Sequence, residues 1–230
     1  MKNLKLIKKH VDSYYKRNFK YYEDIYNEKN THFKLYFNKV INLLKTNDVK
    51  PKSILMLGCG DGNKLYYYKK ILKSKINCGI DFSNSAIQTG KKRYKDIQLF
   101  NMSSLEIIEK YKYDFIICNH FLYLLDREEI FNQFNKIYKK LNIDGYLLIE
   151  DFDPLFKHSN NNIHTKKVKS YKMSHDNFLE ESGLFKLVYK IRISQKATWG
   201  RKDKKFFKSD DLGLSLFKKI NFDKSFPENI

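Results

Sequence analysis

The chain has 230 residues and a formal net charge of +19, with 45 Lys and Arg against 26 Asp and Glu. This length is typical of one domain with a sizeable core, and the most apolar segment, residues 115–125, is too short to span a membrane. The first ten residues include charges but have no continuous apolar stretch behind them, so we expect no signal peptide. The three cysteines lack metal-ligand spacing and fit a reducing compartment, which predicts a cytoplasmic protein without a metal site.

The high content of Lys is the feature that favours nucleic-acid binding, because clustered basic side chains neutralise phosphates. Only five of the basic residues are Arg, however, and Lys is spread along the whole chain. Specific nucleic-acid sites favour the bidentate side chain of Arg. We therefore interpret the charge as a general compositional bias and keep RNA as an alternative substrate.

Helical patterns and short apolar runs alternate over the first two thirds of the chain. Residues 1–50 are expected to form an N-terminal helical cap, since apolar side chains recur at helical spacing between Phe33 and Leu44, and Pro51 then stops the helix. In the core that follows, residues 51–150, five strands alternate with helices, which predicts a parallel sheet with helices on both faces. The strands are predicted at 53–57, 76–80, 97–100, 113–118 and 146–150, and the helices at 64–73, 85–94, 104–110 and 128–141.

The last third of the chain departs from this alternation. Residues 151–169 are polar and predicted to be a loop, and one more helix is expected at 173–182. Residues 184–230 contain two apparent strands, 185–193 and 212–220, with no good helix between them. This pattern predicts a C-terminal antiparallel hairpin at the sheet edge. All segments together, 1–230, are interpreted as a single domain.

A glycine-rich run, Gly58-Cys59-Gly60-Asp61-Gly62, follows the first predicted strand. Glycines at a strand-to-helix turn let the backbone approach a ligand closely, although a tight turn alone would also use them. The dinucleotide-binding pattern needs a further glycine where this chain has Asn63, and Asp61 would lie near a pyrophosphate. A cofactor without phosphate groups therefore fits the loop better.

Asp81 ends the second predicted strand, 19 positions after Gly62. The carboxyl ends of neighbouring parallel strands meet at one edge of the sheet, so Asp81 should face the same crevice as the glycine-rich loop. There its carboxylate can accept hydrogen bonds from both hydroxyls of a ribose, each worth about 1.5 to 3 kcal/mol. An acid that ends a strand for solubility is the competing interpretation.

The runs ILMLGCGDG and GIDFS resemble the first and second motifs of the class I S-adenosylmethionine-dependent methyltransferases. The resemblance covers residues 31–150. It implies a doubly wound α/β fold with a seven-stranded, mostly parallel sheet, helices on both faces and an antiparallel C-terminal strand inserted in the sheet. It also implies S-adenosylmethionine as the cofactor.

The resemblance further implies a set of cofactor-binding residues. Asp81 would bind the ribose, Phe82 would pack against the adenine, and residues 101 and 102 would edge the adenine ring. The full set is Gly58, Cys59, Gly60, Asp61, Gly62, Asp81, Phe82, Asn101, Met102 and Asn119. Two positions depart from the family, since Met56 replaces a frequent acid and Asn101 a frequent Asp, so backbone carbonyls would hold the amino group of the methionine part.

The end of the fourth strand, Cys118-Asn119-His120-Phe121, is where this topology places the reaction. Methyl transfer from a sulfonium is an in-line displacement that depends mainly on positioning. A general base is needed only for a hydroxyl acceptor, and His120 is the candidate, because an unperturbed pKa near 6.5 suits proton removal at neutral pH. A strand-end histidine satisfied by backbone groups is the alternative.

The sequence after the fourth strand has neither the Asn-Pro-Pro-aromatic run of amino-methylating enzymes of nucleic-acid bases nor a Pro-Cys nucleophile. Carboxylates follow strand five, but only Asn119 follows strand four, which does not favour a magnesium-assisted mechanism. The tyrosines of the start are candidates for a lid over the cofactor, with helical core packing as the alternative: Tyr14, Tyr15, Tyr21, Tyr22 and Tyr26.

Methyltransferases of this class often carry an acceptor-binding insertion after strand five, which here is 151–183. The candidates for acceptor binding there are Asp151, Asp153, His164 and Tyr171, with a solvated polar loop as the alternative. The hypothesis is methyl transfer to an oxygen or nitrogen of a small metabolite or carbohydrate. The alternatives are an RNA methyltransferase, and a non-catalytic S-adenosylmethionine-binding module that supports a partner.

Overall fold

The computed structural model describes residues 2–25, 29–106, 111–162, 167–193 and 211–221. Two helices, α1 (Lys2–Ile25) and α2 (Thr31–Thr46), precede the sheet. Seven strands form the main sheet in the order β3-β2-β1-β4-β5-β9-β8. Their bounds are β1 Ser53–Leu57, β2 Ile76–Asp81, β3 Gln98–Asn101, β4 Tyr113–Asn119, β5 Leu141–Phe152, β8 Phe185–Ile193 and β9 Leu212–Lys219.

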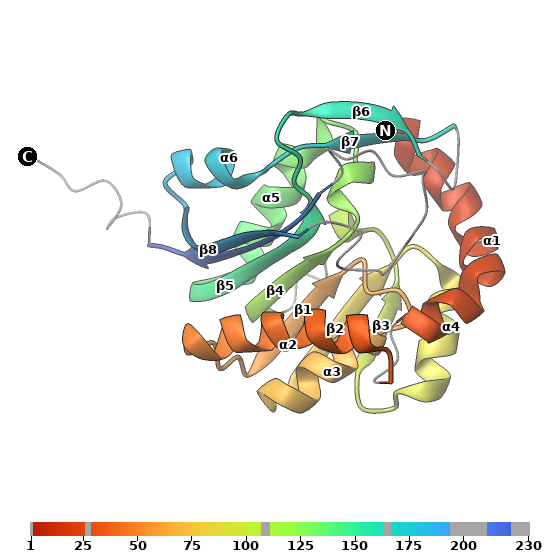
Figure 1. Cartoon of the computed structure of the whole chain (residues 1–230), viewed down its shortest axis with the longest axis horizontal. Helices are drawn as coiled ribbons and strands as arrows, with labels where there is room; N and C mark the ends of the chain where they lie inside the picture. Colours follow the sequence, from red (N-terminus) through yellow and green to blue (C-terminus); the bar gives the residue numbers. More distant parts are fainter. Residues whose placement is uncertain (1, 26–28, 107–110, 163–166, 194–210, 222–230) are drawn as a thin grey trace, which may run out of the picture.

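Strands β1 to β5 run parallel, and β9 is antiparallel to both of its neighbours, β5 and β8. The predicted fold class is therefore confirmed. The last two strands form the predicted antiparallel pair at the sheet edge. Strand β9 lies between β5 and β8, as the family resemblance implies, so that it is covered on both sides and β8 forms the edge (Figure 1).

Helices cover both faces of the sheet. Side chains alternate between the faces of a strand, so Ile54 and Met56 join one core cluster while Leu55 and Leu57 join the other. The first cluster contains residues of α2 and α3 (Asn63–Leu72), and the second contains residues of α5 (Glu129–Lys140) and α6 (Asp176–Glu181). Helix α4 (Asn84–Arg93) contacts α1 and β3.

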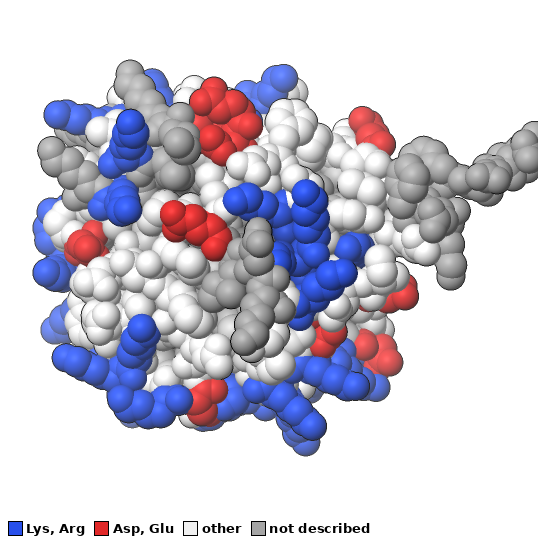
Figure 2. All heavy atoms as spheres, turned by 180° about the vertical axis from the view of Figure 1, so that it is seen from behind, with Lys and Arg blue, Asp and Glu red and all other residues white. Residues whose placement is uncertain are grey.

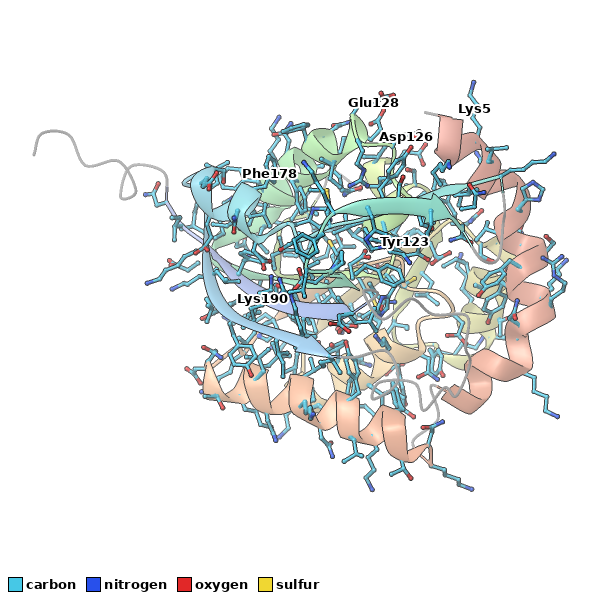
Figure 3. All side chains as sticks on the ribbon, turned by 45° about the horizontal axis from the view of Figure 1, so that its top comes forward. Lys5, Tyr123, Asp126, Glu128, Phe178 and Lys190 are labelled. Atoms are coloured by element: carbon cyan, nitrogen blue, oxygen red, sulfur yellow. The ribbon has the colours of Figure 1, made fainter. Side chains whose placement is uncertain are left out.

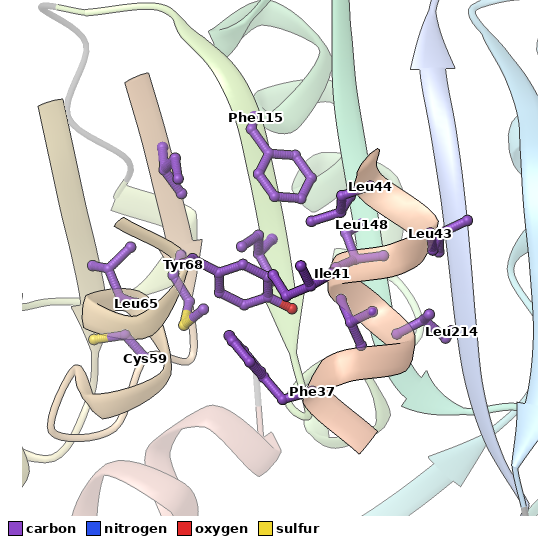
Figure 4. Packing of buried hydrophobic residues seen from close by; sticks show 14 of the residues in the cluster. Phe37, Ile41, Leu43, Leu44, Cys59, Leu65, Tyr68, Phe115, Leu148 and Leu214 are labelled. Carbon is purple, nitrogen blue, oxygen red and sulfur yellow. The ribbon is translucent and has the colours of Figure 1, made fainter. Parts of the chain in front are cut away.

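Tyr68 of α3 lies at the centre of the first cluster (Figure 4). Its ring centroid is 5.0 Å from that of Phe37 in α2 and 6.2 Å from that of Phe115 in β4, and the residue is fully buried. Burial of such aromatic rings contributes much of the stability of a core. The phenol hydroxyl points to the carboxyl end of β5, where it has a polar partner described below.

Two predicted elements differ from the structure. The polar segment 151–169, expected to be a loop, contains the strand β6 (His158–Asn161). This strand pairs antiparallel with β7 (Lys169–Lys172), which packs on the 3-10 turn η2 (Leu122–Leu124). Backbone pairing stabilises these strands despite their low intrinsic β-propensity, so composition alone misled the prediction. The helix expected at 104–110 is a 3-10 turn, η1 (Ser104–Glu106), in its described part, and residues 107–110 lie outside the described residues.

Candidate cofactor and acceptor site

A cavity of about 250 Å³ lies at the carboxyl ends of β1, β2 and β4. Strand ends and the glycine-rich loop form its floor, and α1 and η2 contribute further walls. The lining residues come from four parts of the chain. They include Ile7, Val11, Tyr14 and Tyr15 from α1; Gly58, Cys59, Gly60, Asp61, Asn63 and Lys64 from the β1–α3 region; Asp81, Phe82 and Ser83 from the end of β2 and after it; and Met102, Asn119, His120, Phe121 and Tyr123 from the chain after β3.

The three glycines of the loop all have positive φ, but they differ in what surrounds them. A Cβ on Gly58 would lie 2.6 Å from the backbone oxygen of Asn119, and a Cβ on Gly62 would lie 2.9 Å from side-chain atoms of Ile97 and Leu99. These two positions need glycine for packing. Gly60 has φ +57 with no atom within 4 Å of its Cβ position, so open space of the cavity lies in front of it, where a ligand can approach the backbone.

Asp81 faces the glycine-rich loop, as the topology predicts. Its two carboxylate oxygens accept hydrogen bonds from the backbone N–H of Gly60 and of Ser83, both at 2.8 Å. Burial raises the pKa of Asp81 more than these two bonds lower it. Each carboxylate oxygen has a further lone pair, so Asp81 can still accept hydrogen bonds from two vicinal hydroxyls.

The remaining predicted adenine contacts separate into two groups. Phe82 and Met102 line the cavity. Asn101 does not line it, because its side-chain amide donates to the backbone oxygens of Asp81 (3.1 Å) and Phe82 (2.7 Å). In the structure Asn101 therefore fixes the turn that carries Asp81.

Cys59 and Asp61 occupy the loop between the glycines. Cys59 is buried, and burial raises the pKa of its thiol well above the usual value, so the thiolate is disfavoured. Asp61 accepts a hydrogen bond from the backbone N–H of Asn63 at 3.2 Å and lies 3.7 Å from the guanidinium of Arg93. Both residues line the cavity.

Helix α1 is anchored beside the cavity by Asp12. One carboxylate oxygen of Asp12 accepts hydrogen bonds from the hydroxyl of Ser83 and from the backbone N–H and hydroxyl of Ser85, all at 3.0 Å. Ser83 is the N-cap of α4, where negative charge is favourable. The contact places Tyr14 and Tyr15 in the cavity wall, whereas the side chains of residues 21, 22 and 26 lie outside the described set.

A buried polar network lies below the cavity, at the ends of β4 and β5, and the sequence analysis did not anticipate it. The ammonium of Lys64, in the first turn of α3, forms an ion pair with Glu150 and donates to the side-chain oxygen of Asn119 at 2.9 Å. The hydroxyl of Tyr68 donates to the other oxygen of Glu150 at 2.6 Å, and the amide of Asn119 donates to the backbone oxygen of Gly58 at 2.8 Å. The network thus ties the glycine-rich loop to three elements.

His120, the predicted base, follows β4 directly and lines the cavity. It has φ +51, and its backbone N–H donates to the backbone oxygen of Glu150 at 2.8 Å. Burial and the nearby charge of Lys64 lower the pKa of His120 to about 3, against the smaller opposite effect of Glu150. The imidazole is therefore neutral at neutral pH, and a weak proton acceptor.

The predicted acceptor-binding residues that the structure describes, Asp151, Asp153 and Tyr171, do not line the cavity. Asp151 is buried and accepts a hydrogen bond from the backbone N–H of Leu122 at 2.8 Å, and burial raises its pKa to about 7. Asp153 pairs with Lys190 and Arg192, each at 2.9 Å. The ring of Tyr171 lies 4.9 Å from the guanidinium of Arg127. His164 falls among the residues that are not described.

Asp151 contacts η2, which carries the cavity-lining residue Tyr123, and Tyr171 contacts Arg127, which also bonds to η2. Arg127 donates to the backbone oxygens of Leu122 and Leu125, both at 2.8 Å, and Asp151 accepts from the backbone N–H of Leu122, so the two side chains together hold η2. The ring of Tyr123 packs edge-on against Phe152, with centroids 4.8 Å apart, beside the β6–β7 pair (Figure 3). The role of Asp151 and Tyr171 as direct acceptor ligands stays a prediction.

No group of three or more metal-ligating side chains that could hold an ion occurs within the described ranges. Over the same residues, none of the helices combines the length and the apolar character that crossing a bilayer requires. The three cysteines, Cys59, Cys78 and Cys118, are buried and unbridged.

The strand order, the glycine-rich loop and the cavity beside Asp81 define the class of this protein: a class I methyltransferase fold, whose cofactor is S-adenosylmethionine. A family model described as a methyltransferase domain matches residues 48–211. The chain therefore belongs to this methyltransferase family, which confirms the resemblance stated above.

Solved structures of methyltransferases share the whole fold. The 1,6-didemethyltoxoflavin-N1-methyltransferase of Burkholderia thailandensis superposes with a TM-score of 0.70 at 13% identity, over 95% of this chain and 89% of that chain. Magnesium protoporphyrin IX methyltransferase of Synechocystis PCC 6803 superposes with a TM-score of 0.61 at 14% identity, over 92% and 96%. At these identities the likeness establishes the fold.

Two curated relatives are the uncharacterized proteins RP028 of Rickettsia prowazekii and MJ0906 of Methanocaldococcus jannaschii. Each is 30% identical to this chain, over 108 and 116 residues respectively. The matches cover 44% and 48% of this chain, and 43% and 31% of the relatives, so this chain matches less than half the length of either.

Proposed function

We propose that this protein transfers the methyl group of S-adenosylmethionine to a nitrogen or oxygen of a small metabolite, and that a partly apolar amine fits best. The observation that carries the proposal is the cavity itself. Besides His120, its lining includes large side chains from α1 and from η2 and the residue after it, namely Tyr14, Tyr123, Leu124 and Leu125. Such walls match an acceptor with an aromatic or aliphatic body better than they match a carbohydrate.

The proposed cofactor fits the residues present. Asp81 would accept hydrogen bonds from the ribose hydroxyls, Phe82 and Met102 would contact the adenine, and the open space before Gly60 would receive the cofactor against the loop backbone. When bound, S-adenosylmethionine supplies a methyl group on a positively charged sulfur. The contribution of the chain is then to hold the acceptor in line with that methyl group.

The environment of His120 favours an acceptor that needs no base. A neutral imidazole with a pKa near 3 retains a proton poorly at neutral pH, so it would remove one from an alcohol inefficiently. A neutral amine, a ring nitrogen or an already ionised oxygen is nucleophilic without that help. His120 would then act by orienting the acceptor through a hydrogen bond.

An RNA acceptor is the second candidate, and the charge of +19 is the observation in its favour. Figure 2 shows Lys and Arg side chains on much of one face, with Asp and Glu between them. The mixture of signs and the walls contributed by α1 support a small acceptor instead. RNA would have to insert a single base past Tyr14 and Tyr123.

The test combines calorimetry with turnover. S-adenosylhomocysteine is titrated into the protein, and methyl transfer from S-adenosylmethionine is then followed with panels of amines, phenols, carboxylic acids, sugars and RNA. The proposal expects binding, and turnover with small amines that His120→Ala reduces without weakening cofactor binding. Turnover with RNA alone, which salt suppresses, would favour the RNA alternative. Cofactor binding without turnover on any panel would favour a non-catalytic module.

A further inference from the structure

We infer that Lys64 binds the carboxylate at the amino-acid end of S-adenosylmethionine, and that Glu150 and Asn119 hold the Lys64 ammonium in place for this contact. The inference rests on the proposed function and deepens it, because it assigns a residue to the end of the cofactor that the sequence motifs leave without a charged partner. The position two residues before Gly58 is Met56, which is buried in the core.

The first argument is the distribution of charge around the cavity. Among the described residues that line it, Lys64 is the one permanent cation, and the acids Asp61 and Asp81 belong to the loop and to the end of β2. Of the charged groups of S-adenosylmethionine, only the carboxylate is negative. Charge complementarity therefore directs that carboxylate to Lys64 and away from the two acids.

The second argument is position. Asp81 ends β2, Asn119 ends β4, and β1 lies between these strands. Neighbouring strands are about 4.8 Å apart, so the two ends are separated by about 10 Å across the floor of the cavity. In S-adenosylmethionine the sulfur and three carbons lie between the ribose and the carboxylate. A ribose at Asp81 therefore leaves the carboxylate at the β4 side, where Lys64 bonds to Asn119.

The third argument is the burial of the ion pair. The side chains of Lys64 and Glu150 are 4% and 0% exposed. Removing two such charges from water costs several kcal/mol per ion, and an apolar pair of similar size is often as stable or more so. Stability alone therefore does not explain a lysine at this position. A charged group in a cavity wall, held by two polar partners, is what recognition of an anion requires.

The partners of Lys64 also determine its geometry and its net effect. Glu150 and Asn119 fix the ammonium from two sides, and the ring of Tyr36 lies 5.3 Å below it. A preorganised ammonium loses little side-chain entropy on binding. Glu150 offsets part of the charge of Lys64, which lessens the repulsion between the ammonium and the positively charged sulfur. Glu150 itself does not line the cavity, so it acts as a positioning residue.

The experiment compares two ligands that differ only in the carboxylate. S-adenosylhomocysteine carries it, and S-adenosyl-3-thiopropylamine lacks it. Calorimetry gives both dissociation constants for the wild type and for Lys64→Met combined with Glu150→Gln, which removes both charges and leaves no unpaired buried ion. Lys70→Met, at an exposed lysine of the same helix, is the matched control.

The inference expects the wild type and the Lys70 control to prefer S-adenosylhomocysteine by at least tenfold, and the double variant to bind both ligands alike. An equal loss of affinity for both ligands, with the preference retained, would assign Lys64 a purely structural role and overturn the inference. If the double variant does not fold, Lys64→Gln serves instead, because its amide removes the charge and can still bond to Glu150 and Asn119: a lost preference supports the charge contact, and a preference retained as in the wild type overturns it. Binding of neither ligand by folded wild type would overturn the cofactor assignment as well, which separates the two failures.

Discussion

Gly90 lies where α4 packs against the glycine-rich loop, and replacing it with Ala should disturb both the stability and the cofactor site. A Cβ at this position would lie 2.1 Å from the backbone oxygen of Asp61 and 2.5 Å from a methyl carbon of Leu99. The Leu99 side chain can move, but the Asp61 oxygen belongs to the backbone of the loop. Removing the clash between the new Cβ and the Asp61 oxygen therefore requires that α4 and the loop move apart.

The magnitude follows from two opposing effects. Overpacking of this kind costs about 1 to 3 kcal/mol, and a backbone clash belongs near the upper end of that range. Ala in a helix interior is favoured over Gly by about 1 kcal/mol. We expect Gly90→Ala to lower the free energy of unfolding by about 2 kcal/mol, which is a fall of roughly 4 to 8 °C in Tm for a chain of this size.

Urea unfolding monitored by circular dichroism measures the first effect, and titration with S-adenosylhomocysteine measures the second, since Asp61 lines the cavity. The control is Gln88→Ala, an exposed position of the same helix, which should change stability by less than about 0.5 kcal/mol. A Gly90→Ala protein as stable as the wild type or more stable, as helix propensity alone would give, would refute the packing argument.

Three further substitutions test the carboxylates. Asp81→Asn should weaken S-adenosylhomocysteine binding at least tenfold, about 1.4 kcal/mol, by calorimetry; an unchanged dissociation constant would contradict the ribose contact. Although partial burial opposes it, hydrogen bonds from Ser85 and Ser83 lower the pKa of Asp12 below 3.8, so its contribution to stability should persist above pH 4 and disappear as the pH falls through the lowered value. Urea unfolding at several pH values should show this dependence in the wild type and not in Asp12→Ala. Burial raises the pKa of Asp151 to about 7, so the folded state binds more protons than the unfolded state between about pH 4 and 7, and stability should fall as the pH rises through that range. Asp151→Asn should remove this fall, and equal pH profiles for the two proteins would argue against a buried, protonatable Asp151.

The parallel core could be predicted from the sequence because its signals are local. The apolar run 53–57 before the glycine-rich loop, and Asp81 at the end of the next strand, occupy the predicted positions. A strand buried on both faces reads as a continuous apolar run, and glycines with positive φ mark where it must end. The five parallel strands needed only these signals and the rule that crossovers are right-handed, whereas the inserted antiparallel strand was implied by the family resemblance.

The buried pair could not be predicted in the same way, because Lys64 and Glu150 are 86 positions apart. A lysine in the first turn of a helix usually points to water, and no periodic pattern distinguishes this one. The β6–β7 pair was missed for a related reason: Asn and Lys have low β-propensity, and the pairing depends on tertiary contacts with η2. Side chains whose partners are distant in the chain carry no local signal.

The insertion of β9 between β5 and β8 has a consequence for how the protein is made. During synthesis β5 and β8 leave the ribosome before residues 212–219, so the apolar edge of β5 has no neighbour on that side until the last strand emerges. Exposed strand edges pair readily with other chains, and non-local pairing is slow. A chain that ends before residue 212 would therefore leave this edge of β5 unpaired and open to pairing with another chain.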